Sequence, residues 1–279
     1  MSDEPLVVAD DGLYTPKIKR HSLEKIRLHN RYAAIFATAM RPKWPQLAYI
    51  GLFAGAGRAR LAASGKIVET SALAVLRQPR QFTHYIYVDR DERCTEALAH
   101  RVEALRGDAK VSILQVDAND SATEVLNALP TFGKDRGLLC FCFVDPFGLQ
   151  LQFSTIRALS ARKMDFLILL MLGADWRRNL KQYLQDPESK RIEQFIDCPT
   201  WRDEYAIQPT KSIHFLLRKF DEAMQSLGYL SATQDAHTIK VYGKGVMLYM
   251  LAFYSKKTLG QQFWQDTRSS LSQQIGLGL

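Results

Sequence analysis

The chain has 279 residues, of which 47% are hydrophobic and 24% charged, and a formal net charge of +8 at pH 7. This length and composition predict a soluble globular protein with a large buried core. No run approaches the roughly 18 to 20 apolar residues of a membrane-spanning helix, and the acidic N-terminus lacks a basic-then-apolar signal pattern. We therefore expect a cytoplasmic protein without membrane contact.

The first 45 residues predict an arm followed by a basic helix. Residues 1–16 are polar and acidic without a clear period, which predicts a flexible arm. Apolar positions recur at helical spacing from 21 to 40, so residues 17–45 are assigned to a basic N-terminal helix that ends before Pro42 and Pro45. Its basic residues, against the single acid Glu24, are Lys17, Lys19, Arg20, Lys25, Arg27, Arg31, Arg41 and Lys43. Such a stretch attracts a polyanion, although a solvated helix face has the same composition.

Strands alternate with helices from residue 46 to residue 173. Apolar runs at 47–53, 85–88, 111–116, 138–144 and 166–172 predict five strands, and 91–105, 122–129 and 153–159 predict helices between them. A helix is also predicted to begin at 59–63, to break, and to resume at 70–76, and residues 133–137 predict a turn. This alternation favours an α/β fold with a parallel sheet and right-handed crossovers.

The last third of the chain predicts an insertion and then the completion of the sheet. Residues 174–212 are charged and aromatic and are interrupted by Pro187 and Pro199, which suggests an inserted helical subdomain or lid. Residues 213–279 predict a helix at 213–227, two strands at 236–242 and 246–254 joined at a glycine turn, and a last helix from residue 259. The domain scheme is therefore an arm, a basic helix, a nucleotide-binding core, an insertion and a closing segment.

Cysteine and histidine spacing gives no sign of a metal site. Cys94, Cys140, Cys142 and Cys198 lack the paired spacing of zinc ligands, which predicts reduced core thiols. His21 and His29 lie on one predicted helix and are interpreted as polar surface residues.

Three short segments close predicted strands and outline a nucleotide-type pocket. Phe53, Ala54, Gly55 and Gly57 form a glycine turn, which lets backbone approach a ligand. Asp89 ends the second strand, where a carboxylate holds ribose hydroxyls in dinucleotide-binding folds. The third segment, Val144 to Gly148, contains Asp145 and lies where an acceptor would meet the cofactor.

Together these features resemble the class I methyltransferase fold, which has a seven-stranded, mostly parallel sheet with a closing antiparallel hairpin and binds S-adenosylmethionine. The resemblance implies that Asp89 contacts the ribose and that Asp117 lies by the adenine. It also implies cofactor contacts from the glycine turn.

More specific stretches resemble the three-Cys-motif partner (TcmP) family. They are His21 with Glu24 and Lys25, and residues 49–57, 85–91, 144–148 and 247–257. The family is named for gene neighbours that encode a predicted metal-cluster protein with three cysteines. The resemblance therefore implies a partner protein of that kind.

Asp145, Pro146, Phe147 and Gly148 are similar to a stretch in tRNA methyltransferases that modify the exocyclic amine of guanine. The Asp145 carboxylate and the Pro146 carbonyl would accept the hydrogens of such an amine and aim its lone pair at a methyl group, while Phe147 stacks on the base. These three residues are the predicted catalytic set. A turn shaped by Pro146 and Gly148 after a buried strand would give the same pattern.

The acceptor side is less defined. Trp176 and Arg177 follow the fifth strand and would clasp a base and its phosphate, although packing at a helix start explains them equally well. Gly51 occupies the position where methyltransferases of this type commonly carry an acid, which weakens the expected grip on the amino-acid end of the cofactor.

The sequence favours an S-adenosylmethionine-dependent methyltransferase acting on a nucleic-acid base. The alternative is a catalytically inactive module of the same fold that binds a partner protein or nucleic acid. A methyltransferase for a small molecule or a protein would leave the basic stretch without a role.

Overall fold

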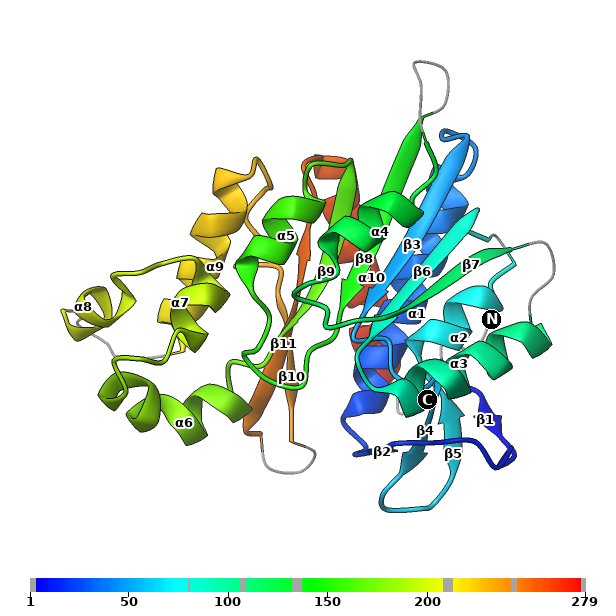
Figure 1. The fold of residues 1–279 in the computed structure, drawn as a ribbon, viewed down its shortest axis with the longest axis horizontal. Helices are drawn as coiled ribbons and strands as arrows, with labels where there is room; N and C mark the ends of the chain where they lie inside the picture. Colours follow the sequence, from blue (N-terminus) through cyan, green and yellow to red (C-terminus); the bar gives the residue numbers. More distant parts are fainter. Residues whose placement is uncertain are drawn as a thin grey trace.

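The computed structural model describes residues 4–79, 81–105, 109–131, 137–207, 213–241 and 245–276. In these ranges the chain forms a central sheet covered by helices on both faces, with a helical subdomain at one end and a small second sheet at the other (Figure 1). The predicted turn at 133–137 and the tip of the predicted hairpin lie mostly outside the described residues.

The large sheet confirms the predicted α/β fold. Its order is β10-β11-β9-β8-β3-β6-β7, and β11 pairs antiparallel with both neighbours while β3, β6, β7, β8 and β9 pair in parallel. The strands are β3 (Gln46–Leu52), β6 (His84–Asp89), β7 (Lys110–Gln115), β8 (Leu138–Val144), β9 (Met164–Leu170), β10 (His237–Lys240) and β11 (Met247–Tyr254). β6, the next strand of this sheet along the chain, pairs on one side of β3, and β8, which follows β7, pairs on the other side. This reversal of strand order opens a crevice at the carboxyl end of β3.

Burial explains the continuous apolar runs of the central strands. Nearly every residue of β3, β8 and β9 is buried, because helices cover both faces of the sheet. One face packs on α1 (Ser22–Met40), α2 (Ser71–Leu76), α3 (Glu92–Leu105) and α10 (Thr258–Gly276). The other packs on α4 (Ala122–Ala128), α5 (Phe153–Leu159) and α9 (His214–Ser226).

The N-terminal segment differs from its prediction. Residues 4–16 lie on the core, where β1 (Val7–Val8) pairs with β5 (Ile67–Glu69). Two more short strands, β2 (Lys17–Ile18) and β4 (Arg58–Leu61), complete a four-stranded sheet at the lower right of Figure 1. The helix predicted to begin at 59–63 is therefore wrong, because this backbone pairs with strands that are distant in sequence.

The predicted helical insertion consists of α6 (Ala174–Gln185), α7 (Arg191–Ile196) and α8 (Trp201–Ala206), at the left of Figure 1. Buried aromatic rings join it to α9: Tyr205 packs edge-on against Phe215, and Phe195 lies 5.1 Å from Phe220 between ring centroids. These rings belong to the same apolar cluster as one face of the large sheet, so the insertion is anchored directly to the core.

His29 is fully buried, which corrects its assignment to the surface. It lies on the apolar side of α1, three residues after the buried Ile26, and its ring hydrogen bonds with the Tyr49 hydroxyl at 2.9 Å. Burial lowers the pKa of the His29 imidazole to about 4. The ring is therefore a neutral part of the core at neutral pH.

Candidate active site

The turn after β3 has an unusual backbone. Phe53, Gly55 and Gly57 all have positive φ, at 60°, 65° and 78°. Phe53 is one of two non-glycine residues with positive φ in the described chain, and such a conformation concentrates at functional sites. A Cβ at Gly57 would lie 2.8 Å from side-chain atoms of Leu73 and Leu98, so packing also requires glycine there.

Asp89 ties this turn to the end of β6. Its Oδ2 accepts a hydrogen bond from the Gly55 amide at 2.8 Å, and its Oδ1 accepts one from the Asp91 amide at 3.0 Å. The carboxylate is thereby held at the carboxyl edge of the sheet with oxygen lone pairs to spare. Asp117, beyond the end of β7, is oriented by the Asn119 amide at 2.9 Å.

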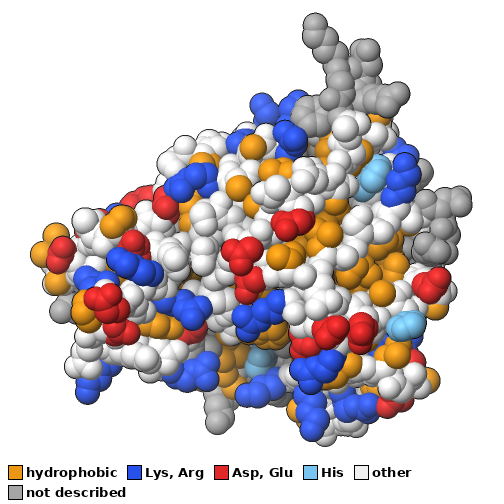
Figure 2. Space-filling view, viewed as in Figure 1, with side chains coloured by type: hydrophobic (Ala, Val, Ile, Leu, Met, Phe, Trp, Pro, Cys, Tyr) orange, Lys and Arg blue, Asp and Glu red, His pale blue; other side chains and the backbone are white. Residues whose placement is uncertain are grey.

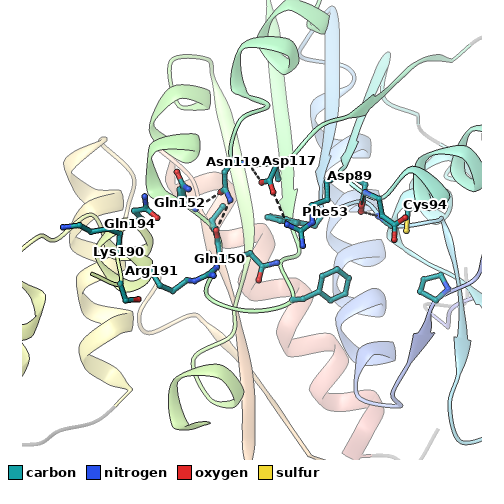
Figure 3. A pocket seen from close by; sticks show the side chains of 18 of the residues that line it. Phe53, Asp89, Cys94, Asp117, Asn119, Gln150, Gln152, Lys190, Arg191 and Gln194 are labelled. Carbon is teal, nitrogen blue, oxygen red and sulfur yellow. Dashed lines mark hydrogen bonds and ion pairs between the residues drawn. The ribbon is translucent and has the colours of Figure 1, made fainter. Parts of the chain in front are cut away.

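A cleft of about 820 Å³ opens in front of these residues. Figure 3 shows side chains that line it. Phe53, Gly55, Asp89 and Asp117, all predicted to bind a cofactor, line it. Of the other two predicted residues, Ala54 faces a second cavity, and Gly57 packs behind the turn. Tyr14 and Pro16 of the N-terminal segment also line the cleft, a position that the prediction of a flexible arm did not anticipate.

The second cavity, of about 100 Å³, lies beside the glycine turn and shares Pro16, Phe53, Gly55 and Phe147 with the main cleft. Lys25, Gly51 and Asp145 line it as well. The Lys25 ammonium donates to both carboxylate oxygens of Asp145, at 2.7 and 2.6 Å. Lys25 was predicted to bind nucleic acid, but helix α1 turns it inward, so it belongs to this cavity instead.

The loop after β8 presents an exposed ring. Phe147 is 80% exposed although it borders both cavities. Asp175 of α6 holds the loop by accepting a hydrogen bond from the Leu149 amide at 2.7 Å. A Cβ at Gly148 would lie 2.6 Å from the same carboxylate, which explains the glycine. Asp175 is a positioning residue that sequence reasoning missed, although it adjoins the predicted Trp176.

Trp176 is buried, so it does not stack on a ligand. Its ring is 2% exposed and packs edge-on against Trp201 and Tyr205, with centroids 6.1 and 5.5 Å away. The prediction that it clasps a base is therefore wrong, because α6 turns it into the apolar core, against α8. Arg177 next to it is exposed.

The far wall of the cleft comes from residues just before α7 and within it. Lys190, Arg191 and Gln194 lie beside Gln150 and Gln152, on the side of the cleft away from Asp89 (Figure 3). Ser189 lines the same cleft. No sequence pattern marked these residues, because they lie in a charged stretch that Pro187 interrupts and reach the cleft only through the packing of the insertion. This wall presents side-chain amides and cations to a ligand bound in the cleft.

Comparisons with known proteins concern the fold. No protein-family model matches the chain, and no curated protein matches it. A Legionella pneumophila protein of the DUF519 family is 9% identical and similar over 87% of this chain and 90% of its own, with a TM-score of 0.49. TYW2 of Pyrococcus horikoshii, solved in complex with MeSAdo, is 13% identical over 92% of this chain and 73% of its own, with a TM-score of 0.44.

A third likeness is to the O-methyltransferase of Bacillus cereus, solved in complex with SAH. It is 11% identical, the similarity covers 80% of each chain, and the TM-score is 0.42. The fold assignment rests on the strand order: counted along the chain, the strands of the large sheet lie in the order 3-2-1-4-5-7-6, and the seventh is antiparallel. The fold is that of the class I methyltransferases.

The basic stretch does not form one surface. Lys17, Lys19 and Arg20 are exposed beside the small sheet, and Figure 2 shows lysine and arginine side chains along the lower rim of this face. Arg27 pairs with Glu4, and Arg31 is half-buried. The exposed basic residues thus lie in two places, before α1 and, with Arg41 and Lys43, directly after it.

The described residues offer no reactive thiol or metal cluster. All four cysteines are free, and burial raises the pKa of the Cys94 thiol, which lines the cleft, to about 12. In the described ranges, no group of three His, Cys, Asp or Glu side chains is placed to hold a metal ion. No helix there is long and apolar enough to cross a membrane.

Proposed function

We propose that the protein is an S-adenosylmethionine-dependent methyltransferase that acts on an exocyclic amine of a nucleic-acid base. The observation that carries the proposal is the 80% exposed ring of Phe147 at the junction of the two cavities, directly after Asp145 and Pro146. Exposing a phenylalanine costs hydrophobic free energy, and base stacking on the ring recovers it.

The cofactor fits residues on both sides of the turn. The Asp89 carboxylate would hold the ribose hydroxyls, and Asp117 with Asn119 would face the adenine. Open space in front of Gly55, where a Cβ would contact nothing within 4 Å, admits a ligand close to the backbone. When bound, the cofactor supplies an electrophilic methyl group on a sulfonium.

The chain contributes position rather than covalent catalysis. The Asp145 carboxylate and the Pro146 carbonyl accept hydrogens from the acceptor amine, and Asp175 keeps their loop in place through the Leu149 amide. A covalent route through cysteine is disfavoured because burial keeps the Cys94 thiol protonated at neutral pH.

The chain further fits the three-Cys-motif partner family, with a three-cysteine protein as partner. Support comes from Lys25, Asp89 and Asp145, which belong to separate matching stretches and lie around adjoining cavities. One observation favours the alternative of a catalytically inactive module: Gly51 brings no acid to the small cavity. Such a module would bind nucleic acid through Lys17, Lys19 and Arg20.

The test is transfer of a labelled methyl group from S-adenosylmethionine to total tRNA or to DNA, with methylated nucleosides identified by mass spectrometry. Phe147→Ala should lower transfer about a hundredfold and leave affinity for S-adenosylhomocysteine within threefold. Leu184→Ala, at an exposed apolar residue elsewhere, is the control. Cofactor binding without transfer to either nucleic acid would contradict the proposed acceptor.

A further inference from the structure

The ion pair between Lys25 and Asp145 is enclosed rather than exposed. Their side chains are 15% and 21% exposed, and both line the small cavity. Taking an ion pair out of water has a desolvation cost, so such a pair is weak evidence for a purely stabilising role. Its position in a cavity points to a ligand that uses both charges.

Helix α1 aims Lys25 from a fixed position. The Tyr249 hydroxyl donates to the His21 carbonyl at 3.1 Å, and Glu24 pairs with His237 at 2.7 Å. Both contacts attach the first turn of α1 to the C-terminal hairpin. The lysine is thus preorganised, and its side chain needs little ordering when a ligand arrives.

The Lys25–Asp145 pair still has a hydrogen-bond donor and hydrogen-bond acceptor positions that it does not use. An ammonium has three donors, of which Lys25 uses two on Asp145, and a carboxylate accepts about four hydrogen bonds. A ligand with neighbouring carboxylate and ammonium groups would set its carboxylate on Lys25 and its ammonium on Asp145. Each charge then has an opposite charge beside it, and the neutral pair matches the neutral ligand end.

Gly51 sets the charge of this cavity. A Cβ there would lie 3.3 Å from the Tyr87 ring and 3.4 Å from the Tyr49 ring, so both rings already crowd the place of a side chain. With glycine, Lys25 and Asp145 balance each other. An acid at residue 51 would add a negative charge beside that balanced pair.

We propose that Lys25 and Asp145 bind the α-carboxylate and the α-ammonium of the amino-acid end of S-adenosylmethionine, and so replace the acid absent at Gly51. The proposal rests on the proposed function: Lys25 and the α-ammonium use three of the about four hydrogen bonds that the Asp145 carboxylate accepts, which leaves one for the acceptor amine. The small cavity adjoins the main cleft through Phe53 and Gly55, which gives one ligand access to both.

The test compares two ligands by isothermal titration calorimetry. S-adenosylhomocysteine carries the amino-acid end, and 5′-methylthioadenosine has the same adenosine and thioether without it. Lys25→Met should weaken S-adenosylhomocysteine at least about tenfold, equivalent to 1.4 kcal/mol, and leave methylthioadenosine within twofold. Lys19→Met, at an exposed lysine near the start of α1, should change neither affinity.

A double variant guards against misfolding. Lys25→Met leaves the Asp145 carboxylate without its partner, whereas Lys25→Met with Asp145→Asn removes both charges. The double variant should fold and lose the preference for S-adenosylhomocysteine over methylthioadenosine. Equal weakening of both ligands, or an unchanged preference, would overturn the proposal. If the wild type binds neither ligand, the proposed function itself fails, which is a different result.

Discussion

The two walls of the main cleft are built differently. On the near wall, Asp89 and Gly55 are joined by a hydrogen bond, and the N-terminal segment closes over them. On the far wall, Arg191 is exposed, and the side chain of Lys190, just before α7, is 61% exposed and pairs with Glu193 of that helix. The near wall is thus held rigidly, as the proposed cofactor site requires, whereas the far wall is able to adjust to the proposed acceptor.

Arg101 of α3 holds the near wall together. Its guanidinium is 2% exposed and donates to both carboxylate oxygens of Asp11, to the Tyr14 carbonyl and to the Ala56 carbonyl. The same contact lowers the pKa of the Asp11 carboxyl to about 2. One side chain therefore ties the N-terminal segment to the glycine turn.

The largest expected effect comes from removing this tie. Arg101→Met should lower the free energy of unfolding by about 3 kcal/mol, because it removes several charge-assisted hydrogen bonds and leaves the buried Ala56 carbonyl without its donor, and cofactor affinity should fall with it. Urea unfolding measures the first effect. Arg93→Met, at an exposed arginine paired with Asp91, is the control and should leave stability nearly unchanged. Equal effects of the two variants would show that the near wall does not depend on Arg101.

Asp89→Asn should weaken cofactor binding at the near wall directly. Loss of the charge weakens the bonds to the Gly55 and Asp91 amides and the expected ribose contact, so S-adenosylhomocysteine should bind about 30 to 100 times more weakly, equivalent to about 2 to 3 kcal/mol. Calorimetry measures the affinity, with the exposed Asp120→Asn as control. A change of less than threefold would remove Asp89 from the cofactor site.

The far wall should respond in the opposite way. Replacing Lys190 and Arg191 by alanine should raise the KM for the nucleic-acid acceptor about tenfold and lower the salt dependence of its binding by about two counterions. The affinity for S-adenosylhomocysteine should stay unchanged. The exposed Lys181→Ala is the control. A loss of cofactor affinity would contradict the assignment of Lys190 and Arg191 to the acceptor.

A small effect is expected outside both walls, at Asp165 of β9. Burial raises the pKa of its carboxyl from 3.8 to about 7, although a Ser255 hydrogen bond opposes the shift. The folded state therefore binds the extra proton, and this contribution to stability is lost as the pH rises from about 4 to about 7.

Asp165→Asn should remove that loss, on the order of 1 to 2 kcal/mol between pH 6 and pH 8. The comparison is made by urea unfolding as the difference between variant and wild type. This difference cancels the opposite contribution of His29, whose lowered pKa makes stability rise with pH up to about 6.5. Parallel pH profiles of the two proteins would contradict the assignment.

The same contrast explains what the sequence could predict. The strands, the glycine turn and Asp89 were predictable because apolar runs and the residues that end them are local patterns. The ion pair of Lys25 with Asp145 spans 120 residues, and that of Arg101 with Asp11 spans 90. Such long-range pairs leave no periodic signal, so the inward turn of Lys25 and the ordered N-terminal segment could not be predicted.

The burial of Trp176 inside the insertion also could not be predicted from the sequence. Trp176 follows the fifth strand, where acceptor-facing loops belong, but its partners Trp201 and Tyr205 lie on another helix. Only the packing of α6 against α8 decides that the ring faces inward. The residues of the far wall could not be predicted for the same reason, because only the packing of the insertion brings them to the cleft.

The most direct test of the preformed near wall is thermal unfolding of the wild type with and without S-adenosylhomocysteine. At a hundred times its dissociation constant, a ligand adds about 2.7 kcal/mol to the free energy of unfolding. We predict a clear upward shift in Tm that Asp89→Asn lacks. No shift at millimolar ligand, in a folded protein that still binds tRNA, would contradict the cofactor site and favour a catalytically inactive module.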